Sequence, residues 1–226
     1  MTRFRLMTAN VLEDSADPAA LAALIDRLDP DIVFLQEMTE GPAEVLTSRF
    51  DNHYVFPSAE FEGRGVATKF DAECGSVEIP SRPGTYARFE LDGRELIAGG
   101  FHMSNPIQFP WWRSVAERRD QVAAVIEWGR SQDSDALVLA GDFNATPIWP
   151  LYKRLVADWD DLPAELAATE GRDPDLTWAW RPGWPRMLRI DHVFGRGVRA
   201  ITSTVEPVQG SDHHALVVDV ELNPTP

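Results

Sequence analysis

Short, uninterrupted runs of apolar residues, set between amphipathic segments, constrain the fold of this chain more than any other feature. The runs Ile32–Leu35 and Ala136–Ala140 are too short for buried helices and are typical of strands buried on both faces. Helical periodicity appears elsewhere, as in the segment that opens at Asp17-Pro18 and places its leucines on one face. Helices interleaved with strands predict a layered α/β or α+β domain, because each sheet face has to be covered.

The other elements are expected at segments bounded by turn residues. A long amphipathic helix is expected over Trp111–Trp128, with Val115 in its apolar stripe and Gly129 at its end. The stretch from Asp158 to Met187 is expected to be rich in loops. No repeat or linker interrupts the pattern, and we expect a single domain over residues 1–226. Strands are further expected over Phe4–Thr8, His53–Phe56, Gly65–Phe70, Ser76–Ile79, Tyr86–Leu91, Glu95–Phe101, Arg189–Phe194, Val198–Val205 and Ala215–Leu222, and shorter helices over Pro42–Arg49 and Pro147–Val156.

The charge of the chain bears on its partners. Its 21 Lys and Arg residues against 36 Asp and Glu residues give a net charge of −15, and only Lys69 and Lys153 are lysines. Such a field repels polyanions at long range and disfavours nonspecific coating of nucleic acids, although arginine can still bind a phosphate at short range. The single cysteine, Cys74, excludes an intrachain disulfide.

Targeting patterns are not visible in the sequence. The segment Met1–Asn10 alternates like a strand and lacks the apolar core of a signal peptide. No stretch approaches the ~20 apolar residues that span a bilayer, so no transmembrane segment is expected. We expect a cytoplasmic protein, and no pattern indicates a protein partner.

Several apolar strands end abruptly in acids, amides or histidines. Taken singly, such a residue is typical of a turn, a cap or a structural histidine. The tripeptide Ser211-Asp212-His213 resembles part of a serine hydrolase triad, but no Gly-x-Ser-x-Gly elbow accompanies it. Zinc patterns of the Cys-x-x-Cys or His-Glu-x-x-His type are also missing from the sequence. The strand-end residues are Asn10, Glu37, His102, Asp142 with Asn144, Asp191, and Asp212 with His213.

As a set, these residues indicate a specific chemistry. Strand ends in layered α/β domains are where ligands and catalytic groups collect. The carboxylates and amides are hard oxygen ligands, which suit Mg²⁺ or Mn²⁺ rather than zinc. Histidines beside carboxylates can serve as an oriented base or as a proton relay. A hard metal ion and an oriented imidazole together favour the attack of water on phosphorus.

The order of these pieces resembles the endonuclease/exonuclease/phosphatase superfamily, which includes DNase I and exonuclease III-type enzymes. The Gly-Asp-Phe-Asn and Ser-Asp-His pieces are the most specific, and all the pieces occur in family order. The resemblance implies a four-layer αββα sandwich, in which two packed mixed sheets are flanked by helices. The matching pieces are Thr8-Ala9-Asn10-Val11, Pro30-Asp31-Ile32-Val33-Phe34-Leu35-Gln36-Glu37, Gly100-Phe101-His102, Leu139-Ala140-Gly141-Asp142-Phe143-Asn144-Ala145-Thr146-Pro147, Arg189-Ile190-Asp191-His192-Val193-Phe194 and Gly210-Ser211-Asp212-His213-His214.

The resemblance also implies which residues bind a metal ion. Glu37 would be the main ligand, with Asn10 and Asp212 close to the ion. Some nucleases of the family carry a second acid two residues after the first-strand asparagine, where this chain has Leu12. We therefore expect one Mg²⁺ or Mn²⁺ ion rather than two.

Catalytic roles follow from the same resemblance. Asp142 would orient or deprotonate the attacking water, and Asn144 would hold the phosphoryl group as charge builds on its oxygens. His213, oriented by Asp191, would act as a base or stabilise the transition state. His102 would bind phosphate or donate a proton to the leaving oxygen. The sequence leaves open which residue is the general base.

The substrate is less well defined than the reaction. The family includes nucleases, phosphatases and sphingomyelinases, and fold alone does not select among them. Few lysines and a strongly acidic balance favour a small or lipid-like phosphoester slightly over DNA or RNA. A nuclease of the same family is therefore the alternative, and a catalytically inactive binding module on the same fold is a further one. The retained acids and histidines argue against the inactive module.

An aromatic stretch precedes the Arg-Ile-Asp piece and supplies candidates for substrate binding. Its tryptophans could stack on a base or sugar or rest on lipid, and packing in the core is the alternative. Arg189 could bind a phosphate or instead pair with an acid. The substrate-binding candidates are Trp178, Trp180, Trp184, Leu188 and Arg189.

Overall fold

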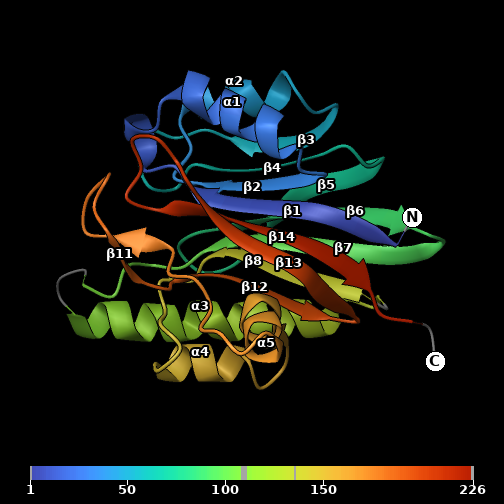
Figure 1. Ribbon diagram of the computed structural model, residues 1–226. Coiled ribbons are helices and arrows are strands. Elements are labelled where there is room, and N and C mark those ends of the chain that lie inside the picture. Colours follow the sequence, from blue (N-terminus) through green and yellow to red (C-terminus); the bar gives the residue numbers. More distant parts are fainter. Residues whose placement is uncertain (1, 108–110, 135, 225–226) are drawn as a thin grey trace.

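Two mixed β-sheets lie face to face with helices on both outer faces (Figure 1). The computed structural model describes residues 2–107, 111–134 and 136–224. Within those residues each sheet has six strands. The first sheet runs in the order β13 (Val198–Pro207), β14 (His214–Leu222), β1 (Arg3–Asn10), β2 (Ile32–Gln36), β4 (Arg64–Thr68) and β3 (Asn52–Phe56). The second runs in the order β5 (Ala72–Val77), β6 (Gly84–Leu91), β7 (Arg94–His102), β8 (Ala136–Asp142), β12 (Asp191–Arg196) and β9 (Asp160–Asp161).

The helices complete four layers. Helices α1 (Pro18–Leu28) and α2 (Glu40–Thr47) cover the first sheet, whereas α3 (Trp111–Ser131), α4 (Pro150–Leu155) and α5 (Leu162–Thr169) lie on the side of the second (Figure 1). A 3₁₀ turn spans Glu13–Ser15, and β10 (Trp178–Ala179) pairs with β11 (Arg186–Leu188) in a small separate hairpin. The expected αββα sandwich is thereby confirmed. No helix among the described residues is both long enough and apolar enough to cross a membrane.

The apolar side chains are divided among three buried clusters, one between each pair of neighbouring layers. The central cluster joins the facing sides of the two sheets through residues such as Phe34 and Ala98. The sheets approach closely there, since a Cβ atom at Gly100 would lie 2.2 Å from Cδ1 of Phe34. The outer clusters join the first sheet to α1 and α2, and the second sheet to α3 and α4. The continuous apolar runs of β2 and β8 reflect this burial on both faces.

Two expectations about local structure, at Val115 and Gly129, were wrong, and one helix was not predicted. Helix α5 lies in the stretch expected to be rich in loops, where Asp161 accepts a hydrogen bond from the backbone N–H of Ala164 and so caps the helix. Val115 is 53% exposed and does not belong to the buried stripe of α3. Gly129 lies inside α3 rather than at its end, at a position where a Cβ atom would lie 2.5 Å from the Trp159 ring.

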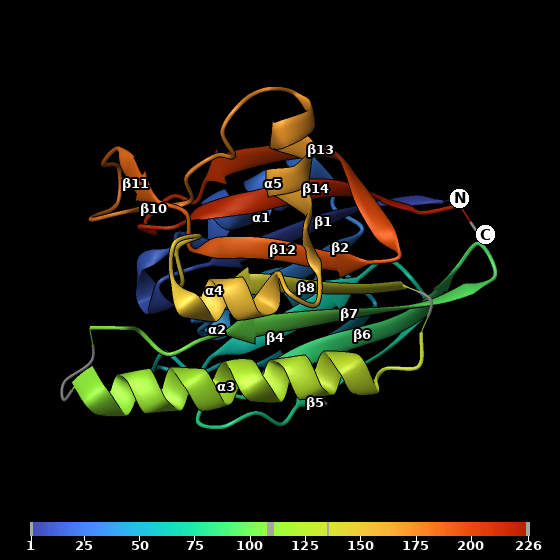
Figure 2. The ribbon, with the colours of Figure 1, turned by 90° about the horizontal axis from the view of Figure 1, so that it is seen from below.

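The strand directions bring the polar residues to one end of the sandwich. Strands β1 and β2 are parallel, as are β7 and β8, so that each pair ends on the same side. The β10–β11 hairpin lies at that end, whereas both chain termini lie at the opposite end (Figure 2).

Candidate active site

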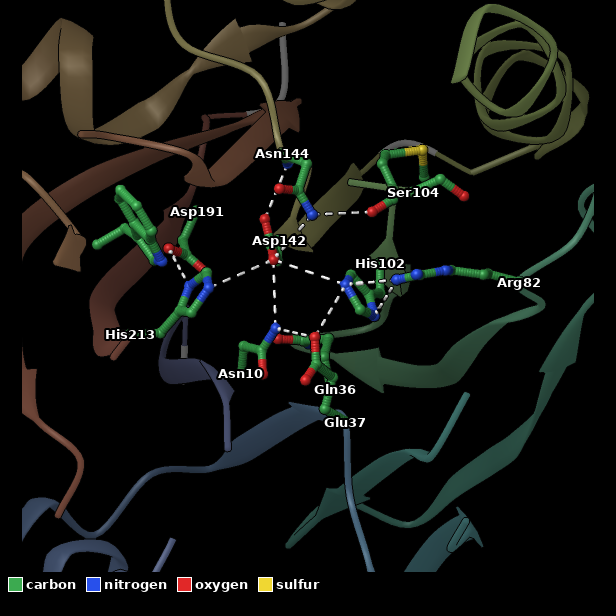
Figure 3. A network of polar contacts seen from close by, with 12 residues as sticks. Asn10, Gln36, Glu37, Arg82, His102, Ser104, Asp142, Asn144, Asp191 and His213 are labelled. Atoms are coloured by element: carbon green, nitrogen blue, oxygen red, sulfur yellow. Dashed lines mark hydrogen bonds and ion pairs between the residues drawn. The ribbon is translucent and has the colours of Figure 1, made fainter. Parts of the chain in front are cut away.

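Strand register and the segment that follows β2 bring five of the expected site residues to one end of the two sheets. Asn10 is the last residue of β1, and the first turn after β2 begins at Glu37. His102, which ends β7, lies in register with Asp142, which ends β8. Asp191 begins β12 and lies opposite Asp142 on its other side. These side chains therefore come from both sheets and converge on one point (Figure 3).

Asp142 lies at the centre of this convergence. Its Oδ2 atom accepts hydrogen bonds from Nδ2 of Asn10 and from Nδ2 of Asn144, both at 3.2 Å. Its Oδ1 atom accepts one from the Asn144 backbone N–H at 2.8 Å. The Nε2 atoms of His102 and His213 each lie 3.6 Å from Oδ2. Burial raises the pKa of Asp142, and the nearby charges of Asp191 and Glu37 raise it further, although His213 opposes this shift.

His213 is held between two carboxylates. Its Nδ1 atom lies 3.0 Å from Oδ2 of Asp191, and its Nε2 atom faces Asp142. Burial lowers the pKa of His213, but the two carboxylates outweigh burial and raise that pKa above its ordinary value. Asp191 itself is fully buried, and the Thr177 hydroxyl accepts a hydrogen bond from its backbone N–H at 3.1 Å. The geometry is that of an imidazole oriented by one acid and directed at another.

Two residues of the site adopt backbone conformations that side chains rarely occupy. Glu37 has φ +52° and Asn144 has φ +48°, which is the left-handed region. This conformation costs more free energy at Glu37 than at Asn144, because asparagine tolerates the left-handed region better than most residues. The Oε1 atom of Glu37 accepts a hydrogen bond from Nδ2 of Asn10 at 2.9 Å. Burial raises the pKa of Glu37. Such local strain is typical of functional sites.

Sequence reasoning did not single out Arg82, a charged residue of the site. Arg82 lies between β5 and β6, is 6% exposed, and places Nη1 2.7 Å from Nε2 of His102. Its guanidinium lies over the Phe61 ring, 4.3 Å from the centroid. Burial lowers the pKa of Arg82, while burial and the adjacent arginine hold the pKa of His102 well below its ordinary value. No motif surrounds Arg82 in the sequence, and its place between Ser81 and Pro83 indicates only a turn.

Asp212 differs from the other acids in its hydrogen bonding. Its Oδ2 atom accepts a hydrogen bond from Nε1 of Trp178 at 3.0 Å. Its Oδ1 atom is buried without a hydrogen-bond partner. Buried polar atoms are almost always paired, so an unpaired carboxylate oxygen in a cleft suggests a ligand.

A cleft of about 710 Å³ opens over these residues. Its lining includes Trp178, Trp180 and Leu188, three of the expected substrate-binding residues. The acids and histidines that line it are Glu13, Glu37, His102, Asp142, Asp212 and His213. Trp184 is exposed but is not among the residues that line the cleft. Arg189 is buried, and its guanidinium pairs with Asp161 rather than facing the cleft. The structure therefore favours the alternative of an acid partner for Arg189.

Comparisons with known proteins identify the fold and the family. The family model described as "Endonuclease/Exonuclease/phosphatase family" matches residues 7–213. The chain belongs to the endonuclease/exonuclease/phosphatase family. Two UPF0294 proteins of Vibrio vulnificus are 31% identical over 147 residues, which is 65% of this chain and 46% of each relative. The chain thus spans about half the length of the curated relatives that it matches.

Solved structures of the endonuclease/exonuclease/phosphatase family superpose over nearly the whole chain. The human Nocturnin catalytic domain with a bound sulfate anion has a TM-score of 0.75 at 18% identity, covering 98% of this chain and 95% of that one. D. rerio TDP2 complexed with a single strand DNA product has a TM-score of 0.76 at 16% identity, covering 98% and 100%. At these identities the likeness establishes the fold.

Members of the endonuclease/exonuclease/phosphatase family commonly use divalent metal ions, and two groups of residues here could bind one. Asp142, Asp191 and His213 place ligand atoms within 4.8 Å of one another. Both ring nitrogens of His213 already face carboxylates, so this group is better described as a hydrogen-bonded chain. Glu37 and Asp212 fit a hard cation better, because both acids line the cleft and the Oδ1 atom of Asp212 has no hydrogen-bond partner.

The arrangement provides groups for phosphoester hydrolysis. A carboxylate with a raised pKa, such as Asp142, accepts a proton from water more readily than an ordinary one. His213 and Arg82 carry positive charge beside the cleft floor and can neutralise phosphoryl oxygens. Asn10 and Asn144 direct amide donors at Oδ2 of Asp142, which fixes the position of this atom.

Proposed function

We propose that this protein is a divalent-metal-dependent phosphoesterase that hydrolyses a phosphodiester. Asp142 orients and deprotonates the attacking water, and His213, oriented by Asp191, stabilises charge on the phosphoryl oxygens. In this proposal Asn144 would hold the phosphoryl group as charge builds on its oxygens, and His102 would bind phosphate or donate a proton to the leaving oxygen. Glu37, Asn10 and Asp212 would hold one Mg²⁺ or Mn²⁺ ion. When bound, the ion would polarise a phosphoryl oxygen and neutralise charge that develops there.

One observation carries this proposal: Oδ2 of Asp142 lies 3.6 Å from an imidazole nitrogen on each side, with two amides bonded to it. Burying an ionised carboxylate costs free energy, because its charge loses contact with water. The burial of Asp142 therefore favours a functional role over a purely structural one. The alternative of an inactive binding module does not explain why a chain would retain buried, strained and mutually repelling groups in one cleft.

The substrate that fits best is a small or lipid-like phosphoester. A cleft of about 710 Å³ is within the ~300–1,000 Å³ typical of small-molecule sites. Its wall is aromatic, and the net charge of −15 opposes the approach of long polyanions. A single-stranded nucleic acid is the second candidate, supported by the TDP2 neighbour with its single strand DNA product and by the tryptophans of the cleft wall. We further propose that residues 1–226 form a single domain and that the protein acts in the cytoplasm.

The test is hydrolysis of a substrate panel by the purified chain. The panel contains bis(p-nitrophenyl) phosphate, p-nitrophenyl phosphate, sphingomyelin vesicles, single-stranded DNA and single-stranded RNA, each with Mg²⁺, with Mn²⁺ and with EDTA. We expect metal-dependent turnover of the diester and loss of turnover in EDTA. The variant Asp142→Asn, which keeps the shape of the side chain, should lower kcat by about 10²–10⁴-fold.

The exposed acid Asp120 on α3 provides the matched control. Asp120→Asn removes the same charge at the surface and should leave kcat unchanged. Turnover that persists in EDTA, or full activity of Asp142→Asn, would contradict the proposed chemistry. A steep fall of DNA binding with added salt, together with faster turnover of DNA, would instead favour the nuclease alternative.

A further inference from the structure

Trp178 makes a contact that stacking on a substrate does not require. Its indole Nε1 atom lies 3.0 Å from Oδ2 of Asp212 and donates a hydrogen bond to it. The sequence assigns Trp178 to substrate binding, yet its one polar atom is directed at an acid of the proposed metal site. An indole N–H can only donate, so the carboxylate of Asp212 is the acceptor in this contact.

The backbone around Trp178 holds this contact in register. Trp178 forms an isolated antiparallel bridge with His213. On one side of it the N–H of Ala179 donates to the carbonyl of Asp212 at 2.9 Å, and on the other the N–H of His214 donates to the carbonyl of Thr177 at 2.8 Å. The segment 177–179 therefore runs beside 212–214 as a short ladder, and the indole spans from one segment to the other.

As a result, the two carboxylate oxygens of Asp212 differ in their hydrogen bonding. Oδ2 is engaged by the indole, whereas Oδ1 is buried and has no hydrogen-bond partner. Both Trp178 and Asp212 line the cleft. With one oxygen bonded and the side chain fixed in orientation, Oδ1 is the atom left to bind a cation. Groups that orient a ligand in this manner typically change metal affinity by about 10–100-fold.

We propose that Trp178 is a positioning residue, which orients Asp212 so that its Oδ1 atom binds the divalent cation. This inference rests on the proposed function, because it requires a metal ion at Asp212. It differs from the expectation of substrate stacking, which depends on the face of the ring rather than on its N–H group.

The neighbouring residue Trp180 makes a matched control possible. Trp180 follows β10, two residues after Trp178. It lines the same cleft and is 58% exposed, with its ring edge-on to Trp178 at 5.9 Å between centroids. Trp178→Phe keeps an aromatic ring but removes the donor, and Trp180→Phe makes the same change without a bond to Asp212. The melting temperatures of both metal-free variants are first compared with that of the parent. This comparison ensures that the metal affinity is measured on folded chains.

The first experiment is calorimetric titration of each metal-free protein with Mn²⁺. Trp178→Phe should raise the Kd for Mn²⁺ by about 10–100-fold, and Trp180→Phe should change it less than twofold. The second uses the parent chain labelled with ¹⁵N, titrated with diamagnetic Mg²⁺. The indole N–H resonance of Trp178 should shift markedly on saturation, and that of Trp180 should not.

The outcomes separate this inference from the proposed function. If the parent binds Mn²⁺ and Trp178→Phe binds equally well, or if the Trp178 indole resonance does not respond to Mg²⁺, the positioning role is wrong and the proposed hydrolysis stands. Equal weakening in both variants would assign the effect to the hairpin as a whole and also reject the role. A parent that binds neither ion would reject the metal site and this inference together.

Discussion

The imidazole of His213 is fixed by Asp191, whose Oδ2 atom lies 3.0 Å from Nδ1 of the ring. The buried acid thereby determines which ring nitrogen faces the cleft and sustains the positive charge of the ring. Asp191 begins β12 of the second sheet, whereas His213 lies 22 residues further along the chain, just before β14 of the first sheet, so the geometry of this pair depends on how the sheets pack.

Replacing Asp191 should therefore impair turnover more than binding. In Asp191→Asn the side chain keeps its shape but loses its charge, so His213 is no longer held in the required orientation and protonation state. We expect kcat to fall by about 10²–10⁴-fold with a small change in KM, as for other oriented imidazoles. Steady-state kinetics on bis(p-nitrophenyl) phosphate measures both constants, and a kcat within twofold of the parent would disprove the role.

Arg82 should be required as an arginine and not merely as a cation. Its planar guanidinium contacts His102 and lies over Phe61, and a lysine ammonium cannot make both contacts. We expect Arg82→Lys to lower kcat/KM by about 10–100-fold. Arg64, whose guanidinium lies over the Phe56 ring at 4.4 Å from the centroid, is the control. If Arg64→Lys loses as much activity as Arg82→Lys, the effect is not specific to the site.

The buried ion pair between Asp161 and Arg189 should make stability depend on pH. Burial raises the pKa of Asp161, but the hydrogen bond from His192 and the charge of Arg189 outweigh burial, and the pKa lies well below its ordinary value. A carboxyl group whose pKa is lowered by folding stabilises the folded state fully at pH values above its ordinary pKa, which is near 4. This contribution is lost as the pH falls through the pKa of the group in the folded state. Asp161→Asn should cost about 3–5 kcal/mol at neutral pH, and less near pH 2.

Urea denaturation of the parent and of Asp161→Asn at about pH 7 and pH 2 checks this prediction. Asparagine is also a good N-cap, so the loss does not arise from the start of α5. Asp26→Asn removes an exposed partner of Arg49 and should have a smaller effect. A difference between parent and Asp161→Asn that stays constant with pH would contradict the assignment.

The thiol of Cys74 should react slowly. Burial raises its pKa to about 11, and Glu73 adds to the shift. The thiolate is the reactive form, so alkylation by iodoacetamide at pH 7.5 should be on the order of a hundredfold slower than for an unhindered thiol. Mass spectrometry of the intact chain follows the reaction, which should accelerate about tenfold per pH unit up to pH 10. Reaction at the rate of N-acetylcysteine would show that the thiol is neither buried nor perturbed.

The sequence was sufficient to predict the layered fold and most of the polar cluster, because both depend on local pattern. Continuous apolar strands such as β8 predict burial on both faces, and residues at the ends of neighbouring strands have to meet. Interactions between distant side chains carry no such signal. Arg82 meets His102 through a turn, and Arg189 meets Asp161 across 28 residues, so neither partner could be predicted from spacing.

The same limit explains the errors in the helices. Hydrophobic periodicity assigns Val115 to a buried face, but the described start of α3 instead buries Ser114 and Arg118, whose polar groups bond to the loops near the cleft. Helix α5 is short and follows Asp161, and its capping depends on an acid that also pairs with Arg189. In both cases a polar requirement of the tertiary structure overrides the local pattern.

The left-handed backbone at Glu37 implies a conflict between durability and catalysis. Glycine adopts this conformation without the steric penalty of a side chain, so Glu37→Gly should relieve strain and burial of charge at the same position. Selection of this chain for heat resistance alone would therefore favour substitutions that dismantle its cleft, and thermostable variants should be screened for turnover at every round.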